Sequence, residues 1–239
     1  MTSHTIHTQF NGRLVFVGFG SIGRGVLPLI LRHIGGLTPQ RITIVTADEA
    51  GLGCAEAFGV RHIVQPIKPD NYRSVLEPLL GLGDFLLNLS VDVSSIELVK
   101  FARERGALYL DTCIEPWAGG YVDTAVDPAA RSNYAMRHAA LEMRKPDGDT
   151  SPRPTAVLTH GANPGLVSHF LKQALLNIAR DTGVEVSEPS TREEWAALSH
   201  KLGVKVVHVA ERDTQIPSIA KKVGEFVNTW SVDGFISEG

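Results

Sequence analysis

Three glycines spaced as G-x-G-x-x-G are the strongest chemical signal in the chain. They are Gly18, Gly20 and Gly23 in GFGSIG, between the apolar run LVFV and a segment with helical periodicity. In that context the first glycine permits a tight turn, the second lets the backbone approach a pyrophosphate, and the third allows close helix packing. Ser21 and Ile22 begin the helix, where free N–H groups and the positive dipole end favour phosphates. The motif predicts a dinucleotide site, and a glycine-rich turn without a ligand is the alternative.

The ribose-binding acid of such a site normally follows the second strand. Here RITIVT ends at Thr46, and the first carboxylates after it are Asp48 and Glu49. We expect Asp48 to reach the ribose 2′-hydroxyl, and the alternative is a solvated turn residue. Because no arginine follows immediately to accept a 2′-phosphate, the sequence favours NAD over NADP.

Polar residues also follow two later apolar runs, DFLLNLS and ALYLD. Asn88 and Ser90 close the first run, and Asp111 and Thr112 close the second. Ligands of open parallel sheets bind at the carboxyl ends of strands, so we expect Asn88, Ser90 and Thr112 to contact the cofactor. The alternative is that these side chains only satisfy backbone groups of their own loops.

The elements that position these residues alternate between strand and helix. Apolar runs at 14–18, 41–46, 60–65, 84–90 and 107–111 are separated by helical segments at 21–33, 53–59, 71–80 and 94–106. This rhythm predicts a Rossmann-type, doubly wound α/β fold with a parallel sheet covered on both faces. We expect Ser94 and Glu97 to form a capping box, and Pro28 to kink or strain the first helix.

After residue 111 this rhythm breaks. A helix is expected at 131–145, followed by a strand and turn in TAVLTHGANPG, with Pro164 opening a further helix that ends near Arg180. Thr191 and Glu194 have the spacing of a second capping box. The segments VKVVHVAER and EFVNTWSVDGFISEG alternate with period two, as strands do.

Two domains are therefore predicted. Residues 1–165 form an NAD-binding Rossmann-like domain, and residues 166–239 form connecting helices and the beginning of a mixed α+β domain for substrate binding and dimerisation. Because the chain stops within a strand-like element, we expect it to be the first half of a longer enzyme.

Composition excludes several classes of partner. Hydrophobic residues make up 43% of the 239 residues, and 23 basic against 26 acidic side chains give a net charge of −3 without a basic block. Nucleic acids and anionic membranes are therefore not expected partners. The sequence has no apolar run of ~18 residues and no signal segment at its start, so we expect a cytoplasmic protein. Cys54 and Cys113 lack metal-ligating neighbours at useful spacing, so no metal site is expected.

Six motifs together resemble bacterial homospermidine synthases, which are related in fold to saccharopine dehydrogenases. They are GFGSIGRG, NLSVDVSS, LYLDTCIEPW, GANPG, HVAERDTQ and NTWSVDGFISEG. The resemblance implies NAD-dependent transfer of an aminobutyl group between two putrescine molecules, or between spermidine and putrescine. In this reaction NAD takes a hydride from the donor amine, the second amine displaces ammonia from the imine, and the hydride is returned. The resemblance also implies a homodimer.

The resemblance implies catalytic roles for Asn163, Glu211, Trp230 and Glu238. Trp230 would hold the cationic intermediate by a cation–π contact, Glu211 and Glu238 would anchor amine groups, and Asn163 would lie near the nicotinamide. The residue patterns alone leave other interpretations open: Trp230 as a core residue, Glu211 paired with Arg212 or another surface cation, and Asn163 stabilising only its own turn.

The resemblance also implies that Asp92 and Glu115 face the outer part of a substrate channel. A diamine dication needs carboxylates and aromatic faces. The residues with these implied roles provide four carboxylates and the indole of Trp230. From pattern alone, Asp92 caps the turn before Ser94 and Glu115 is a solvated loop residue. Hydride leaves only from a neutral amine, so a base is required. His160 or a carboxylate with a raised pKa could be that base.

Two other functions remain open at this level. A dehydrogenase of the saccharopine or carboxynorspermidine kind would bind an amino-acid carboxylate through an arginine or lysine. Strand alternation, however, directs Arg212 away from the face of Glu211. A non-catalytic NAD sensor would keep the glycine motif but would need neither Trp230 nor Glu238.

Overall fold

A computed structural model describes residues 4–144, 152–212, 214, 216, 218–227, 232 and 235. One compact unit runs to Thr159, and a second spans His160–Thr229. The domain boundary expected after residue 165 stays a prediction. Within the described ranges, no helix combines the length and the apolar content needed to cross a membrane.

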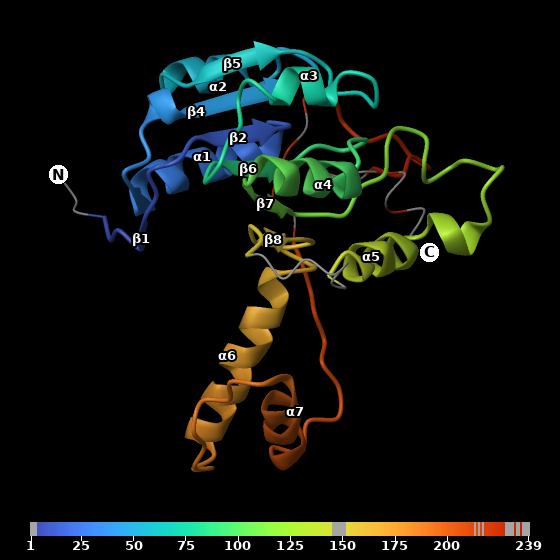
Figure 1. Ribbon diagram of the computed structural model, residues 1–239. Coiled ribbons are helices and arrows are strands. Elements are labelled where there is room, and N and C mark those ends of the chain that lie inside the picture. The colour runs from blue at the N-terminus through green and yellow to red at the C-terminus, as the bar shows by residue number, and fades with distance from the viewer. Residues whose placement is uncertain are drawn as a thin grey trace. The chain divides into compact units, whose positions relative to one another are not determined.

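The first unit is built on a six-stranded sheet (Figure 1). Its strands are β2 (Leu14–Val17), β4 (Ile42–Thr46), β5 (Arg61–Val64), β6 (Phe85–Asn88), β7 (Leu108–Asp111) and β8 (Ala156–Val157). All neighbours are parallel, in the order β5-β4-β2-β6-β7-β8. The chain winds outward from β2 in one direction and then from β6 in the other. This is the doubly wound Rossmann order, which confirms the predicted fold class.

Helices connect the strands. They are α1 (Ser21–His33), α2 (Leu52–Ala57), α3 (Tyr72–Leu76), α4 (Ser95–Arg105) and α5 (Asn133–Glu142), with 3-10 turns η1 (Pro39–Arg41) and η2 (Pro128–Arg131). A short parallel pair, β1 (Thr8–Gln9) and β3 (Ile34–Gly35), lies outside the main sheet.

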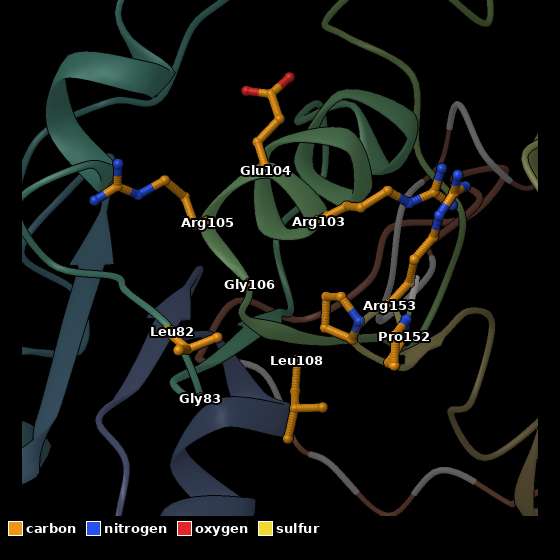
Figure 2. Close-up of a pocket in the computed structure, with 10 residues that line it drawn as sticks. Leu82, Gly83, Arg103, Glu104, Arg105, Gly106, Leu108, Pro152 and Arg153 are labelled. Atoms are coloured by element: carbon orange, nitrogen blue, oxygen red, sulfur yellow. The ribbon is translucent and has the colours of Figure 1, made fainter. Parts of the chain in front are cut away.

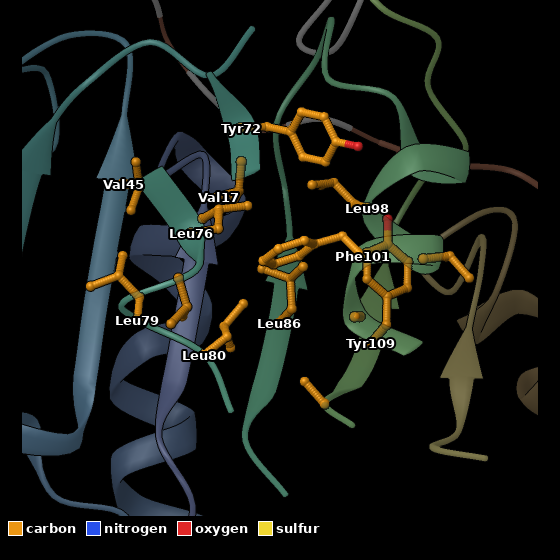
Figure 3. Close-up of a cluster of buried hydrophobic side chains, with 14 of the residues drawn as sticks. Val17, Val45, Tyr72, Leu76, Leu79, Leu80, Leu86, Leu98, Phe101 and Tyr109 are labelled. Atoms are coloured by element: carbon orange, nitrogen blue, oxygen red, sulfur yellow. The ribbon is translucent and has the colours of Figure 1, made fainter. Parts of the chain in front are cut away.

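Both faces of the sheet are buried, which explains its continuous apolar strands. On one face, side chains of α4 such as Leu98 and Phe101 pack against Leu86 and Tyr109 (Figure 3). On the other face, buried residues of α1 and α2 belong to a second cluster with strand residues; its members include Leu27, Ala55, Phe16 and Ile44.

Two helix expectations differ in detail from the structure. The hydroxyl of Ser94 accepts from the Glu97 N–H at 3.3 Å, but the Glu97 carboxylate pairs with Lys100 at 2.8 Å. The start of α4 therefore has a cap rather than the expected reciprocal box. Helix α3 ends at Leu76, before Pro78, because a proline further inside would clash with the preceding turn. Helix α1 includes Pro28, and the kink or strain expected there stays a prediction.

The second unit contains α6 (Leu166–Asp181) and α7 (Arg192–Lys201). They pack through Leu175, Ala179 and Leu198. The predicted capping box of Thr191 and Glu194 is confirmed.

The prediction of a strand in VKVVHVAER is wrong, because residues 204–212 have no regular structure and are mostly exposed. Strand alternation is stable only with a partner strand, and none is present among the described residues of this unit. Most of the second segment predicted as a strand, EFVNTWSVDGFISEG, lies outside the described residues.

Candidate dinucleotide-binding site

The carboxyl ends of the central strands meet at one edge of the sheet. In the register, Val17 pairs with Val45 on one side and with Asn88 on the other, and Asn88 pairs with Asp111. Residues that follow β2, β4, β6 and β7 are therefore brought together although they lie far apart in sequence. The strand order reverses between β2 and β6, which is where ligands of open parallel sheets bind.

Gly18 and Gly20 have different physical reasons to be glycine. Gly18 has a φ of +84°, and a Cβ there would lie 2.6 Å from the backbone nitrogen of Ser90. The turn after β2 therefore excludes a side chain at Gly18. A Cβ on Gly20 would meet no atom within 4 Å. Its missing side chain leaves open space at the start of α1, as expected for a loop that approaches a pyrophosphate.

Gly23 is buried, and a Cβ there would lie 2.7 Å from the ring of Phe19. That ring packs edge-on against Phe16 of β2. The missing side chain at Gly23 therefore lets α1 pack against the ring of Phe19, and not directly against the strand. Ser21 and Ile22 are exposed in the first turn of α1, which has no side-chain cap and no acidic residue. An anion would meet backbone N–H groups there without electrostatic repulsion.

Asp48 lies in an exposed turn after β4. Its Oδ1 accepts from the Ala50 N–H at 2.9 Å, and its backbone carbonyl accepts from the Thr46 hydroxyl at 2.6 Å. The same hydroxyl lies 2.6 Å from Nε2 of His62 on β5. His62 is not among the residues predicted from the sequence, because it lies sixteen positions from Thr46 and only the β4–β5 pairing brings the two together.

Asn88 is buried and its amide is engaged inside the protein. Oδ1 accepts from both the N–H and the hydroxyl of Ser90, and Nδ2 donates to the Tyr109 hydroxyl at 3.3 Å. This arrangement corresponds to the alternative in which these residues support their own loop. Ser90 and Thr112 are half-buried at the same edge. Contact of all three with a cofactor stays a prediction.

Asp111 is fully buried at the end of β7. Its Oδ2 accepts from the Tyr109 hydroxyl at 2.8 Å, and its Oδ1 accepts from the Thr159 N–H at 2.6 Å. Burial raises the pKa of Asp111 to about 6, although these hydrogen bonds oppose the shift. Burial also raises the pKa of Tyr109, so its hydroxyl stays protonated and donates. Period-two alternation directs Tyr109 and Asp111 to one face, and this signal could have identified the pair.

Glu115 is buried, not solvated as its loop position suggested. Burial raises its pKa to about 7, against the hydrogen bond it accepts from the Asp92 backbone. Its Oε2 has no hydrogen-bond partner among the described residues. Asp92 is exposed and has a φ of +61°. A tight turn therefore brings an exposed carboxylate and a buried one together at the edge where β6 and β7 end.

Asn163 and Glu211 belong to the second unit. Asn163 is exposed in a turn closed by a bridge between Gly161 and Gly165. A hollow of about 320 Å³ is lined by Glu211 and Arg212 together with residues of α6 and Ala162. The strand alternation from which Arg212 was expected to face away from Glu211 is absent, because the segment is not a strand. The ring of His160 contacts that of His169, with centroids 5.3 Å apart.

Trp230 and Glu238, the remaining expected catalytic residues, lie outside the described residues. A separate hollow of about 770 Å³ opens at the opposite, amino edge of the sheet. It is lined by residues before β6, β7 and β8, and by Arg103 and Arg105 at the end of α4 (Figure 2). None of the expected site residues that the structure describes lines this hollow. Among the described residues, no group of three or more metal-ligating side chains is present.

Comparison with known proteins identifies relatives of this chain. The chain is 53% identical to homospermidine synthase from Blastochloris viridis, over 100% of this chain and 50% of the relative. It is 45% identical to homospermidine synthase from Mesorhizobium japonicum, over 98% of this chain and 48% of the relative. The chain thus spans about half the length of these relatives. These matches confirm the resemblance inferred from the sequence motifs.

The fold has a counterpart among solved structures. The crystal structure of homospermidine synthase from Legionella pneumophila in complex with NAD superposes with a TM-score of 0.78 at 40% identity. The superposition covers 97% of this chain and 47% of the other. Residues 14–152, from β2 into the segment before β8, match the family described as saccharopine dehydrogenase NADP binding domain. Because this match covers more than half of the chain, the protein belongs to that family.

Proposed function

We propose that this chain is the cofactor-binding part of an NAD-dependent homospermidine synthase. The observation that carries the proposal is 53% identity to such an enzyme over the whole chain. The glycine turn at the strand-order reversal of a Rossmann sheet supports it independently, because this is the physical requirement for dinucleotide binding.

The residues of the first unit fit NAD. The open space at Gly20 would admit the pyrophosphate, and the uncapped first turn of α1 would supply N–H groups to it. The exposed carboxylate of Asp48 would accept from the ribose hydroxyls. NAD, when bound, supplies a site that accepts a hydride from an amine carbon and later returns it.

The overall reaction joins two putrescines and releases ammonia. The donor loses a hydride and a proton to become an imine, the second amine adds, and ammonia leaves. The returned hydride and a proton then reduce the new carbon–nitrogen double bond. Since hydride is borrowed and returned, no net oxidation occurs, and a catalytic amount of NAD is sufficient.

Carboxylates would bind the diamine. The Oε2 atom of Glu115, which has no partner in the described part of the chain, would accept from a substrate ammonium. The Glu115 pKa of about 7 suits proton exchange near neutrality. The exposed carboxylate of Asp92 would attract the same cation. Roles for Asn163, Glu211, Trp230 and Glu238 rest on the family motifs. We further propose that the enzyme is a cytoplasmic homodimer.

The test is product analysis by mass spectrometry. The protein in its natural full length is incubated with putrescine and an amount of NAD⁺ well below the putrescine concentration. We expect homospermidine and ammonia in excess of the NAD⁺ supplied, without accumulating NADH. Stoichiometric NADH with an amino acid or another amine would instead identify an ordinary dehydrogenase. Binding of NAD⁺ without turnover of any amine would identify a sensor. Light scattering tests the dimer, and a fluorescent fusion tests the location.

A further inference from the structure

The end of β4 carries a hydrogen-bonded chain in place of the usual strand-end acid. Thr46 is the last residue of β4 and only 8% exposed. Its hydroxyl lies 2.6 Å from the Asp48 carbonyl and 2.6 Å from Nε2 of His62. All three residues belong to the first unit, at the edge where the glycine turn lies.

The direction of these two hydrogen bonds follows from the groups involved. A carbonyl oxygen can only accept, so the single hydroxyl hydrogen of Thr46 is donated to Asp48. The second contact then requires Nε2 of His62 to donate to the Thr46 oxygen. In its neutral form the ring therefore has its hydrogen on Nε2 and leaves Nδ1 as a bare acceptor. Nδ1 is buried without a partner among the described residues, which is consistent with this assignment.

The chain of bonds fixes the turn that carries Asp48. Thr46 holds the Asp48 backbone through its carbonyl, and the Asp48 Oδ1 holds the Ala50 N–H at 2.9 Å. Hydrogen bonds at the backbone carbonyl and at the side chain thus restrain Asp48, while the residue remains exposed. No lysine or arginine occurs between residues 42 and 60, whereas Glu49 adds a second negative charge. A restrained carboxylate accepts from hydroxyl groups and repels a phosphate.

We propose that His62 is a positioning residue that acts through Thr46 on Asp48. It holds the Asp48 carboxylate where it favours binding of a nucleotide with a free ribose 2′-hydroxyl and disfavours binding of a nucleotide with a 2′-phosphate. The inference rests on the proposed NAD binding of the same site and deepens it. His62 does not contact the cofactor; it acts through the hydroxyl of Thr46.

The test measures dissociation constants of the full-length protein for NAD⁺ and NADP⁺ by calorimetry. His62→Phe keeps the ring volume and removes the donor, and Thr46→Val keeps the shape and removes the hydroxyl. We expect each variant to weaken NAD⁺ binding roughly tenfold, the effect of one hydrogen bond, and to change NADP⁺ binding by less than about twofold. His62→Gln, whose amide can donate to Thr46, should restore NAD⁺ binding to within about twofold of the original protein.

Three controls separate positioning from a structural effect. Thr43→Val makes the same change on the other face of β4 and should leave both constants unchanged. The double variant of His62→Phe and Thr46→Val should be no weaker than either single variant, because both break one chain of bonds. Competition with ADP-ribose should show the same loss as NAD⁺, whereas nicotinamide mononucleotide, which lacks the adenosine ribose, should be unaffected.

Several outcomes would overturn the inference. A lower melting temperature with an unchanged ratio of NAD⁺ to NADP⁺ affinity would show that His62 is structural only. Tighter binding of NADP⁺ than NAD⁺ by the original protein would also overturn it, while leaving dinucleotide binding intact. If the original protein binds neither dinucleotide, the proposed function fails as well.

Discussion

The backbone N–H of Thr159 donates to the carboxylate of Asp111 across 2.6 Å, and Asp111 is fully buried. On its other oxygen this carboxylate accepts from Tyr109, which in turn accepts from Asn88. The network joins the ends of β6 and β7 to the segment after β8. It holds a charged group inside the sheet at the edge where the cofactor is proposed to bind.

This burial predicts a pH-dependent stability. The pKa of Asp111 is about 6 in the folded protein and 3.8 in a solvated chain. Between these values the folded state binds more protons, so the free energy of unfolding falls as pH rises. The loss amounts to roughly 3 kcal/mol between about pH 4 and pH 6. We expect Asp111→Asn to flatten this part of the profile, measured by urea unfolding at a series of pH values. The exposed Asp70→Asn should not change it, and an unchanged slope in Asp111→Asn would contradict the assignment.

Removing the Tyr109 hydroxyl should break the network from its centre. In Tyr109→Phe the Asn88 amide loses an acceptor and Asp111 loses a donor, both in buried positions. We expect a loss of roughly 1–3 kcal/mol in the free energy of unfolding. Tyr134→Phe is the matched control, because Tyr134 is 82% exposed. Equal stability of the two variants would show that the hydroxyl contributes nothing.

Gly18 and Gly20 should separate folding from cofactor binding. Gly18→Ala places a side chain at φ +84° against the Ser90 backbone, so we expect a loss of roughly 2 kcal/mol or more in stability. Gly20→Ala meets no protein atom within 4 Å, and its stability should change by less than about 0.5 kcal/mol. Its NAD⁺ dissociation constant should nevertheless rise roughly tenfold or more, because the methyl group enters the space of the pyrophosphate. Unchanged NAD⁺ binding by Gly20→Ala would count against the proposed position of the cofactor.

Glu115 should matter for both the amine and the pH profile. Glu115→Gln removes a buried carboxyl with a pKa of about 7. Because the pKa of Glu115 is higher in the folded protein than its ordinary value, its contribution to the free energy of unfolding falls as pH rises towards 7. The Glu115→Gln variant should not show this pH-dependent decrease. In steady-state kinetics of the full-length enzyme, we expect the KM for putrescine to rise roughly tenfold or more, the effect of losing a charge-assisted contact. Glu56→Gln, an exposed change on α2, is the control. An unchanged KM would remove Glu115 from the substrate site.

The sequence alone determined the sheet domain and its ligand class. Continuous apolar strands, helical periodicity between them and the spacing of Gly18, Gly20 and Gly23 are local patterns, each readable within a short window. They sufficed for the doubly wound fold, for the position of the glycine turn and, through the six motifs, for the family. The cap of α4 at Ser94 and the capping box of Thr191 were readable for the same reason.

Tertiary structure decided what depends on partners distant in the chain. Whether Glu115 is solvated or buried, and whether Asn88 faces a ligand or Tyr109, depends on which loops pack beside them. The link from His62 to Thr46 exists only because β4 and β5 pair in one register. The alternation in VKVVHVAER suggested a strand, but backbone hydrogen bonds of a strand must be made by a neighbour, so the pattern by itself could not create one.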